Sequence, residues 1–366
     1  MRTCGAVALL AGSVMGCSGS GGGNPPGADT NGSSSGSSSS SGSGGASSGA
    51  TSGSSGGGPG ASSGGSGSSG GAASSSGGSG GSSSGSAASS GAGSGSSGGS
   101  GTPDGGPVWT PPSSSPAHFH WQLSTNFAST DILSGQQGLV VYDIDGENST
   151  AADVTAIHNA GAKAVCYVDV GSLETGRSDY SQFPSSVVGP GVQGWAGENW
   201  LMVTAANQSV ILPLMKARLM SWCQAKGFDA VEPDNLDAFA NGVNVTEADN
   251  VSYDLAIAAL AHGMSMSIGV KNLLPAVTMS SESSAIQSTF DWVLAEQCYQ
   301  YSECSSYTAF ALAGKAVFDV EYGRSPDCAS AAQSHINAQE RDLNLAGPHA
   351  SGYTYTPCIP DSQTTW

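Results

Sequence analysis

The stretch that decides the fold is GFDAVEPDNLDAF, residues 227–239. It carries four acids within nine residues, although only 10% of the chain is charged. Its first half interleaves acids with the apolar residues of a buried strand. Because successive side chains of a strand point to opposite faces, Ala230, Glu232 and Asp234 share one face. Pro233 lacks an NH group and marks the end of strand pairing. The stretch therefore predicts a strand whose acids gather toward its carboxyl end.

Seven other apolar runs share this character, and helix-like stretches separate them. The expected strands cover residues 119–123, 138–145, 162–171, 199–203, 228–234, 264–270, 290–297 and 315–322. Eight strands with intervening helices predict an α/β fold in which a parallel sheet closes as a (β/α)8 TIM barrel. An open doubly wound sheet is the alternative, but no GxGxxG motif follows the first strand.

The chain before this barrel has a different composition. Residues 1–16 combine Arg2 with a short apolar run, which is typical of a secretory signal peptide. The sequence VMGC resembles a bacterial lipobox and predicts lipidation of Cys17, whereas an ordinary signal peptide would leave Cys17 incidental. Residues 17–116 are almost wholly Ser, Gly and Ala and predict a disordered tether with an r.m.s. span of roughly 50–60 Å. We expect a barrel over 117–366 and an exported outer-membrane or cell-surface lipoprotein.

Six cysteines remain in the barrel once Cys17 is assigned to a lipid. An even number in an exported chain predicts disulfides. The expected pairs are Cys298 with Cys304, which flank a short loop, and Cys328 with Cys358, which would close the C-terminus. Cys166 and Cys223 form either a third pair or two buried thiols.

Acids recur at the carboxyl ends of five expected strands. They are Asp143, Asp145, Asp169, Asp234, Glu296, Asp319 and Glu321, and Lys271 follows the sixth strand. Barrel enzymes place their sites at this end of the strands. Any one acid could be a solvated loop residue or a helix cap. Five strands with the same polarity favour a functional site, because burying several carboxylates costs stability unless they bind something.

Two chemistries use such a rim. Paired carboxylates can hydrolyse a glycosidic bond, and acids can hold Mg²⁺ or Ca²⁺ for metal-dependent hydrolysis. The six histidines show no HxH or HExxH spacing, which argues against zinc, and no cofactor motif is present. From Phe119 onward the chain has 26 acids and nine bases, a net charge of −17. Such a domain repels nucleic acid and attracts cationic partners, although surface acids also simply maintain solubility.

Seven motifs occur in order over residues 119–323: WQL, YDID, CYVDVGSLETGRSD, GFDAVEPDNLDAF, SIGVKN, WVLAEQC and VFDVEY. Together they resemble the endo-α-1,4-polygalactosaminidase family, glycoside hydrolase family 114, whose fold is a (β/α)8 barrel. The resemblance implies that Asp234 and Glu296 are the catalytic pair. It also implies cleavage within α-1,4-linked galactosamine polymers, which are cationic where they are deacetylated.

On this interpretation Asp234 is the nucleophile or charge stabiliser and Glu296 the acid/base, with retaining and inverting mechanisms both open. Candidates for holding substrate hydroxyls or amines are Asp143, Asp145, Tyr167, Asp169, Asn235, Asp237, Lys271 and Glu321. The expected partner is a cationic or partly acetylated galactosamine polysaccharide bound by a monomer, with membrane contact through the lipid alone. The alternatives are a non-catalytic acidic lipoprotein that binds glycans and a metal-dependent hydrolase on the same barrel.

Overall fold

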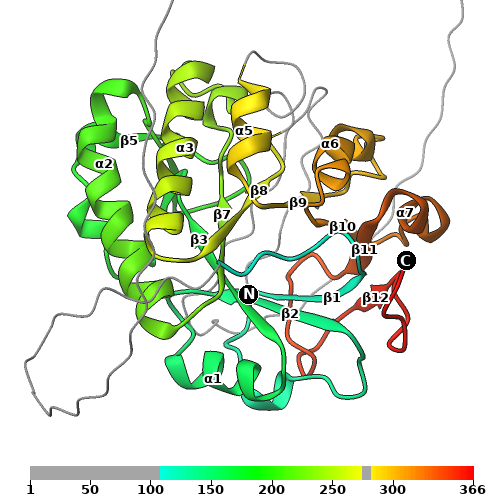
Figure 1. Cartoon of the computed structure of the whole chain (residues 1–366). Coiled ribbons are helices and arrows are strands. Elements are labelled where there is room, and N and C mark those ends of the chain that lie inside the picture. Colours follow the sequence, from blue (N-terminus) through cyan, green and yellow to red (C-terminus); the bar gives the residue numbers. More distant parts are fainter. Residues whose placement is uncertain (1–107, 274–281) are drawn as a thin grey trace, which may run out of the picture. The chain divides into compact units, whose positions relative to one another are not determined.

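The computed structural model describes residues 108–273 and 282–366, and the expected signal peptide, Cys17 and most of the tether lie outside these ranges. Nine strands of the described residues form one sheet (Figure 1). In spatial order they are β1 (Ala117–Gln122), β2 (Leu139–Asp145), β3 (Lys163–Asp169), β7 (Ala230–Asp234), β8 (Ser267–Lys271), β9 (Trp292–Glu296), β10 (Val317–Tyr322), β11 (Ile336–Arg341) and β12 (Tyr355–Pro357). The first eight pair in parallel, and β12 pairs antiparallel with β11.

Side chains close the seam between β1 and β11. The Oδ1 atom of Asn337 accepts a hydrogen bond from the backbone NH of Ala117 at 2.7 Å. Arg341 donates to the carbonyl oxygen of Trp121 and, at 2.8 Å, to that of Ala346. The predicted (β/α)8 barrel is thus confirmed as a nearly closed barrel of eight parallel strands.

Helices surround the sheet. They are α1 (Ala151–Asn159), α2 (Ala205–Arg218), α3 (Glu247–Gly263), α5 (Ser283–Thr289), α6 (Thr308–Leu312) and α7 (Cys328–Ser334). A π-helical turn (Leu219–Cys223) extends α2, and 3-10 turns cover Ser129–Asp131, Tyr180–Gln182, Ser185–Val187, Gln224–Lys226, Ala238–Asn241 and Cys304–Tyr307. Local sequence explains the helix starts: the Oγ1 atoms of Thr150 and Thr246 accept from the NH groups of Asp153 and Asp249. Among the described residues, no helix is long and apolar enough to span a membrane.

The sheet separates two apolar cores. One fills the barrel and includes Phe119, Trp121, Trp292 and Phe318, whereas the other lies between the sheet and the helices. A Cβ atom on Gly269 would lie 2.6 Å from the Trp292 ring, so this position of β8 admits only glycine. The alternation that divides the two cores also decides which polar side chains enter the barrel.

The prediction of a barrel strand over 199–203 is wrong. That segment overlaps β6 (Glu198–Leu201), which lies between β4 (Ser172–Glu174) and β5 (Val188–Gly191) in a separate antiparallel sheet. The remaining barrel strand is β11, which the sequence did not reveal. Consequently residues 228–234 form the fourth barrel strand rather than the fifth.

Three disulfides connect these elements. They join Cys166 to Cys223, Cys298 to Cys304 and Cys328 to Cys358. The two expected pairs are present, and the cysteines whose state was open form the third. This third bond ties β3 to the π-helical turn after α2, directly outside the barrel.

Candidate active site

Lys271, the last residue of β8, is the centre of the polar cluster in the barrel. Its side chain is 2% exposed. The Nζ atom lies 3.2 Å from each of three carboxylate oxygens: Oε1 of Glu232, Oδ1 of Asp234 and Oε2 of Glu296. The same ammonium lies 4.6 Å from the centre of the Trp121 ring. One buried cation of β8 therefore contacts three acids from the two strands that flank it, β7 and β9.

Asp234 is held by hydrogen-bond donors on both carboxylate oxygens. Tyr167, opposite Glu232 in the pairing of β3 with β7, donates its hydroxyl to Oδ2 at 2.9 Å. The backbone NH of Asn235 donates to Oδ1 at 3.0 Å, beside the Lys271 ammonium. Burial and nearby acids raise the pKa of Tyr167 well above its usual value, so the phenol keeps its proton and remains a donor. These donors stabilise negative charge on Asp234.

Glu296 is held differently. Tyr322 donates its hydroxyl to Oε1, and the Nδ2 atom of Asn272 donates to Oε2 at 3.1 Å. Burial raises the pKa of Glu296, although Lys271 and these two donors oppose the rise. A carboxyl that keeps its proton further toward neutral pH is suited to general acid catalysis.

The backbone turns sharply at the rim behind each of these side chains. Asn235, Asn272 and Gln297 follow Asp234, Lys271 and Glu296, and their φ angles are 63°, 52° and 58°. Positive φ is uncommon outside glycine, although Asn adopts it more readily than most residues. The side chains of Asn235 and Asn272 turn back onto acids, since Asn235 Nδ2 donates to Asp169 Oδ2 at 3.0 Å. Such strained positions concentrate at functional sites.

Asp143 and Glu232 form a carboxyl pair beneath the Lys271 ammonium. No donor among the described residues reaches either oxygen of Asp143, which is fully buried. Burial, followed by the charge of Glu232, raises the pKa of Asp143 well above its usual value, so Asp143 keeps its proton beside Glu232. Burial raises the pKa of Glu232 to about 7 against the effect of Lys271. The pair therefore holds a proton at neutral pH.

Three other predicted acids lie buried near the rim and already have partners. Asp169 accepts from the NH groups of Gly171 and Ser172 and from Asn235. Asp145 Oδ2 lies 2.7 Å from Arg177 Nη1. Asp237 lies beyond β7, and burial raises its pKa to about 6.

Glu321 was predicted to hold substrate, but it does not join the cluster. Its Oε1 atom accepts from the backbone NH groups of Tyr299 at 2.8 Å and Gln300 at 3.2 Å, which lie in the loop after β9. Asp319, two residues earlier, accepts from the NH of Cys298 at 3.0 Å. Both acids are on the outward face of β10, whereas Tyr322 is on the inward face with Phe318 and Val320.

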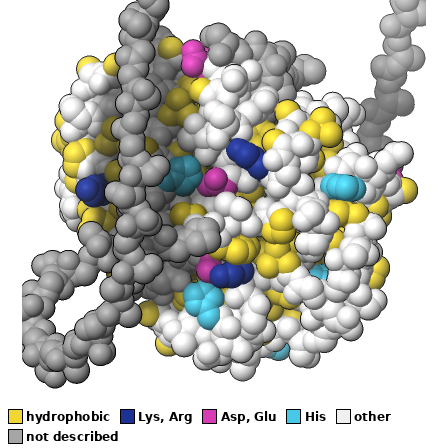
Figure 2. Space-filling view, in the orientation of Figure 1, with side chains coloured by type: hydrophobic (Ala, Val, Ile, Leu, Met, Phe, Trp, Pro, Cys, Tyr) yellow, Lys and Arg dark blue, Asp and Glu magenta, His cyan; other side chains and the backbone are white. Residues whose placement is uncertain are grey.

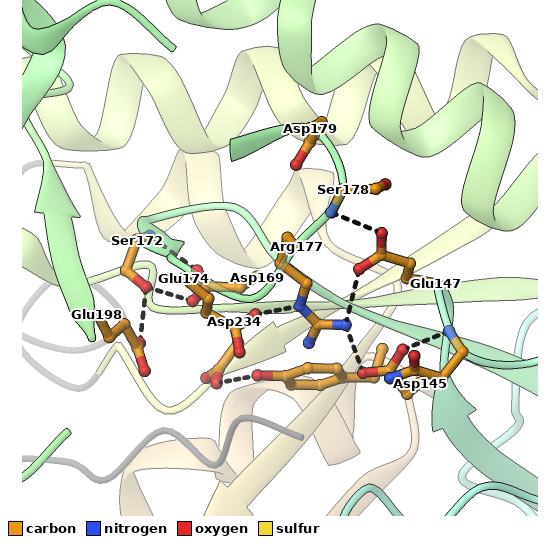
Figure 3. Close-up of polar contacts among 12 residues, drawn as sticks. Asp145, Glu147, Asp169, Ser172, Glu174, Arg177, Ser178, Asp179, Glu198 and Asp234 are labelled. Atoms are coloured by element: carbon orange, nitrogen blue, oxygen red, sulfur yellow. Dashed lines mark hydrogen bonds and ion pairs between the residues drawn. The ribbon is translucent and has the colours of Figure 1, made fainter. Parts of the chain in front are cut away.

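A second buried network, which the sequence did not reveal, flanks Asp234 (Figure 3). Arg177 lies between Glu174, Asp145 and Glu147, and burial raises the pKa of Glu174 to about 7. In the sequence, the only sign of this network was that a single Arg, Arg177, lies within the acidic motif SLETGRSD.

On the other side of this network, the Ser172 hydroxyl lies within hydrogen-bond distance of Asp169 and, at 2.6 Å, of Glu198 of β6, and its single proton can be donated to either. Both Ser172 and Glu198 belong to the small antiparallel sheet. This sheet therefore contributes to the surroundings of the rim.

Much of the acidity of the chain is inside the fold. The buried acids are Asp131, Asp143, Asp145, Asp169, Glu174, Glu198, Glu232, Asp234, Asp237, Asp254, Glu296, Asp319 and Glu321. On the face shown in Figure 2, few charged side chains are visible, and apolar and neutral side chains surround them. The formal charge therefore overstates the surface charge, and the buried cluster is the stronger indication of a site.

Comparisons with known proteins show what the chain is similar to. The profile of glycoside-hydrolase family GH114 matches residues 101–354. The structure of Ega3 from Aspergillus fumigatus, a complex with galactosamine, is similar to this chain at 29% identity and a TM-score of 0.56, covering 68% of this chain and 98% of Ega3. The glycoside hydrolase domain of PelA from Pseudomonas aeruginosa is 13% identical, with a TM-score of 0.47, covering 66% of this chain and 99% of that domain. No curated protein was found to match the chain by sequence.

Proposed function

Because the chain belongs to glycoside-hydrolase family GH114, we propose that it cleaves internal α-1,4 bonds of a galactosamine-containing polysaccharide with Asp234 and Glu296 as the reacting pair. The observation that carries this proposal is that both carboxylates contact one buried ammonium, that of Lys271. The galactosamine bound to the similar structure of Ega3 supports the choice of sugar.

The contacts of the two carboxyls support different roles. Asp234, surrounded by donors, attacks the anomeric carbon while the glycosidic C–O bond breaks. Glu296, whose pKa is raised by burial, gives its proton to the departing oxygen. Water then attacks the anomeric carbon, returns a proton to Glu296 and releases Asp234.

The two carboxylates lie close enough for a mechanism that retains configuration. Oδ1 of Asp234 and Oε2 of Glu296 each lie 3.2 Å from the same nitrogen, so they cannot be farther apart than twice that distance. Retaining enzymes separate their carboxyl groups by ~5–5.5 Å, and inverting enzymes by ~6.5–9.5 Å to admit a water. We propose a covalent glycosyl intermediate on Asp234.

The remaining predicted residues divide by their contacts. Tyr167 and Lys271 hold Asp234, and Asn235 and Asp169 support its strand end. For substrate amines we propose Asp145 at the end of β2 and Asp237 beyond the end of β7, which are 4% and 6% exposed. Lys271 stands where a metal ion would bridge the acids, which favours glycosidase chemistry without a metal over metal-dependent hydrolysis.

Export and anchoring remain part of the proposal. Three disulfides support folding in an oxidising compartment. We propose that Cys17 is lipidated, that residues 17–116 act as a tether, and that the enzyme works as a monomer on polysaccharide at the cell surface without binding nucleic acid. Metabolic labelling with a fatty acid, compared with Cys17→Ser, tests the anchor.

The test of the activity uses the full mature chain and a purified α-1,4-galactosamine polymer, with products sized by mass spectrometry. We expect internal cleavage, unaffected by EDTA, that falls at least ~10³-fold in Asp234→Asn and in Glu296→Gln. Asp254→Asn is the matched control, because Asp254 is a buried acid of α3 that contacts Asn250. Undiminished cleavage by both site variants would overturn the assignment. Saturable binding without cleavage would indicate a glycan-binding protein, and loss of activity in EDTA a metal-dependent hydrolase.

A further inference from the structure

We infer that Glu232 is a positioning residue that shares the Lys271 ammonium with the reacting carboxylates and thereby sets the pH range in which Glu296 holds its proton. This inference rests on the proposed function of Glu296.

Geometry places Glu232 where it can act on Glu296 only through Lys271. Glu232 precedes Asp234 by two residues on the inward face of β7, one pleat deeper than the reacting layer. Its Oε1 atom lies 3.2 Å from Lys271 Nζ, as far as the nearest oxygens of Asp234 and Glu296. All four side chains are no more than 2% exposed, so water screens these charges weakly.

Charge balance then requires a bound proton. The titratable groups that face Lys271 of β8 come from five other strands: Asp143 of β2, Tyr167 of β3, Glu232 and Asp234 of β7, Glu296 of β9 and Tyr322 of β10. Four carboxyls thus meet one ammonium. Asp143 has no donor among the described residues, and burial beside Glu232 raises its pKa, so that it keeps its proton.

Above about pH 7, where Glu232 ionises, the pair therefore contributes one negative charge beneath Lys271. That charge draws on the ammonium that also stabilises ionised Glu296. The weaker stabilisation keeps the proton on Glu296 to higher pH. When a neutral group replaces Glu232, the Lys271 ammonium stabilises ionised Glu296 more strongly. Glu296 then loses its proton at lower pH.

The test compares pH–rate profiles of the full mature chain. In Glu232→Gln we expect the alkaline limb, where the general acid ionises, to move down by about one pH unit. In Asp143→Asn the amide can still donate to Glu232, and the pair keeps its single negative charge. We therefore expect the alkaline limb to stay within about 0.3 pH unit of its position. Asp254→Asn removes a buried acid outside the barrel and leaves the limb in place. A folded Glu232→Gln chain with an unmoved limb would overturn the inference, because a merely structural role lowers activity or stability without moving the profile.

Infrared spectroscopy in D₂O at neutral pH tests the shared proton without substrate. The unmodified chain should show the carbonyl band of one protonated carboxyl that the spectrum of Asp143→Asn lacks. An unchanged band would overturn the inference even where Glu232→Gln fails to fold. If the unmodified chain does not cleave the polymer, the proposed function fails, and the band still decides whether the pair holds its proton.

Discussion

Lys271 Nζ lies 3.2 Å from Glu296 Oε2 and at the same distance from Asp234 Oδ1, although the two acids come from strands on opposite sides of β8. A buried ammonium between two reacting carboxylates lowers the cost of holding them close, because like charges at this distance repel strongly in a dry interior. It also leaves each acid with different remaining partners, Tyr167 for one and Tyr322 for the other.

Lys271→Met removes this charge while it keeps the length and much of the volume of the side chain. We expect kcat to fall at least ~100-fold, because three buried acids lose their shared cation and take up protons instead. Steady-state cleavage and circular dichroism check this. Lys315→Met is the matched control: that amine donates to the carbonyl oxygens of Gln287 at 2.6 Å and Phe290 at 2.5 Å, outside the site. Activity that survives in the folded Lys271 variant contradicts a role in holding the pair.

Tyr322→Phe removes the hydroxyl that donates to Glu296. A donor to a carboxylate stabilises its charged form, so its loss raises the pKa of Glu296 further. The alkaline limb of the pH–rate profile should move to higher pH, opposite to the shift expected for Glu232→Gln, and kcat should fall about tenfold. Tyr253→Phe is the control, because its hydroxyl donates at 2.6 Å to the carbonyl of Val170. A limb that moves down, or not at all, would contradict the contact.

The sequence predicted the barrel and most of the rim because acids at strand ends stand out within apolar runs. It failed at β11, whose inward positions Asn337, Gln339 and Arg341 are polar. These side chains fill the seam with β1, so the strand lacks the continuous apolar run of a buried parallel strand. NWLMV has such a run, but it lies in the small antiparallel sheet.

The outward position of Glu321 was missed for a different reason. Both faces of β10 are buried, so its hydrophobic pattern does not distinguish inside from outside. Only the register of the barrel directs Tyr322 inward and Glu321 outward. Asp234 and Glu296 were assigned to the inward face through their neighbours on the strand, whereas the Lys271 contact that joins them depends on three strands at once.

Glu321→Gln tests this assignment to the outer face. The amide oxygen can still accept from the NH groups of Tyr299 and Gln300, so we expect kcat to remain within about twofold, with a loss of stability of about 1 kcal/mol or less. Kinetics and a thermal melt provide the two measurements. A loss of turnover comparable to that of Glu296→Gln, without unfolding, would return Glu321 to the site.

Buried acids also determine how stability depends on pH. Burial raises the pKa of Glu174 and of Glu232 to about 7, and that of Asp237 to about 6. In each case the folded chain binds more protons than the unfolded chain between the usual pKa, near 4, and the raised one. The free energy of unfolding must therefore fall as the pH rises through this window. His118 and His120, whose pKa values are lowered by burial, oppose this below about pH 6.5.

The acids outnumber the two histidines, since Asp143, Asp254 and Asp319 also have pKa values raised well above their usual range. We expect the free energy of unfolding to be about 1–3 kcal/mol greater at pH 5.5 than at pH 8, which calorimetry at constant ionic strength would detect as a higher Tm. Glu174→Gln removes one titrating group. It should therefore reduce the slope of the free energy of unfolding against pH by the equivalent of up to one bound proton. A Tm that rises from pH 5.5 to pH 8 would mean that the buried acids are ionised in the folded chain.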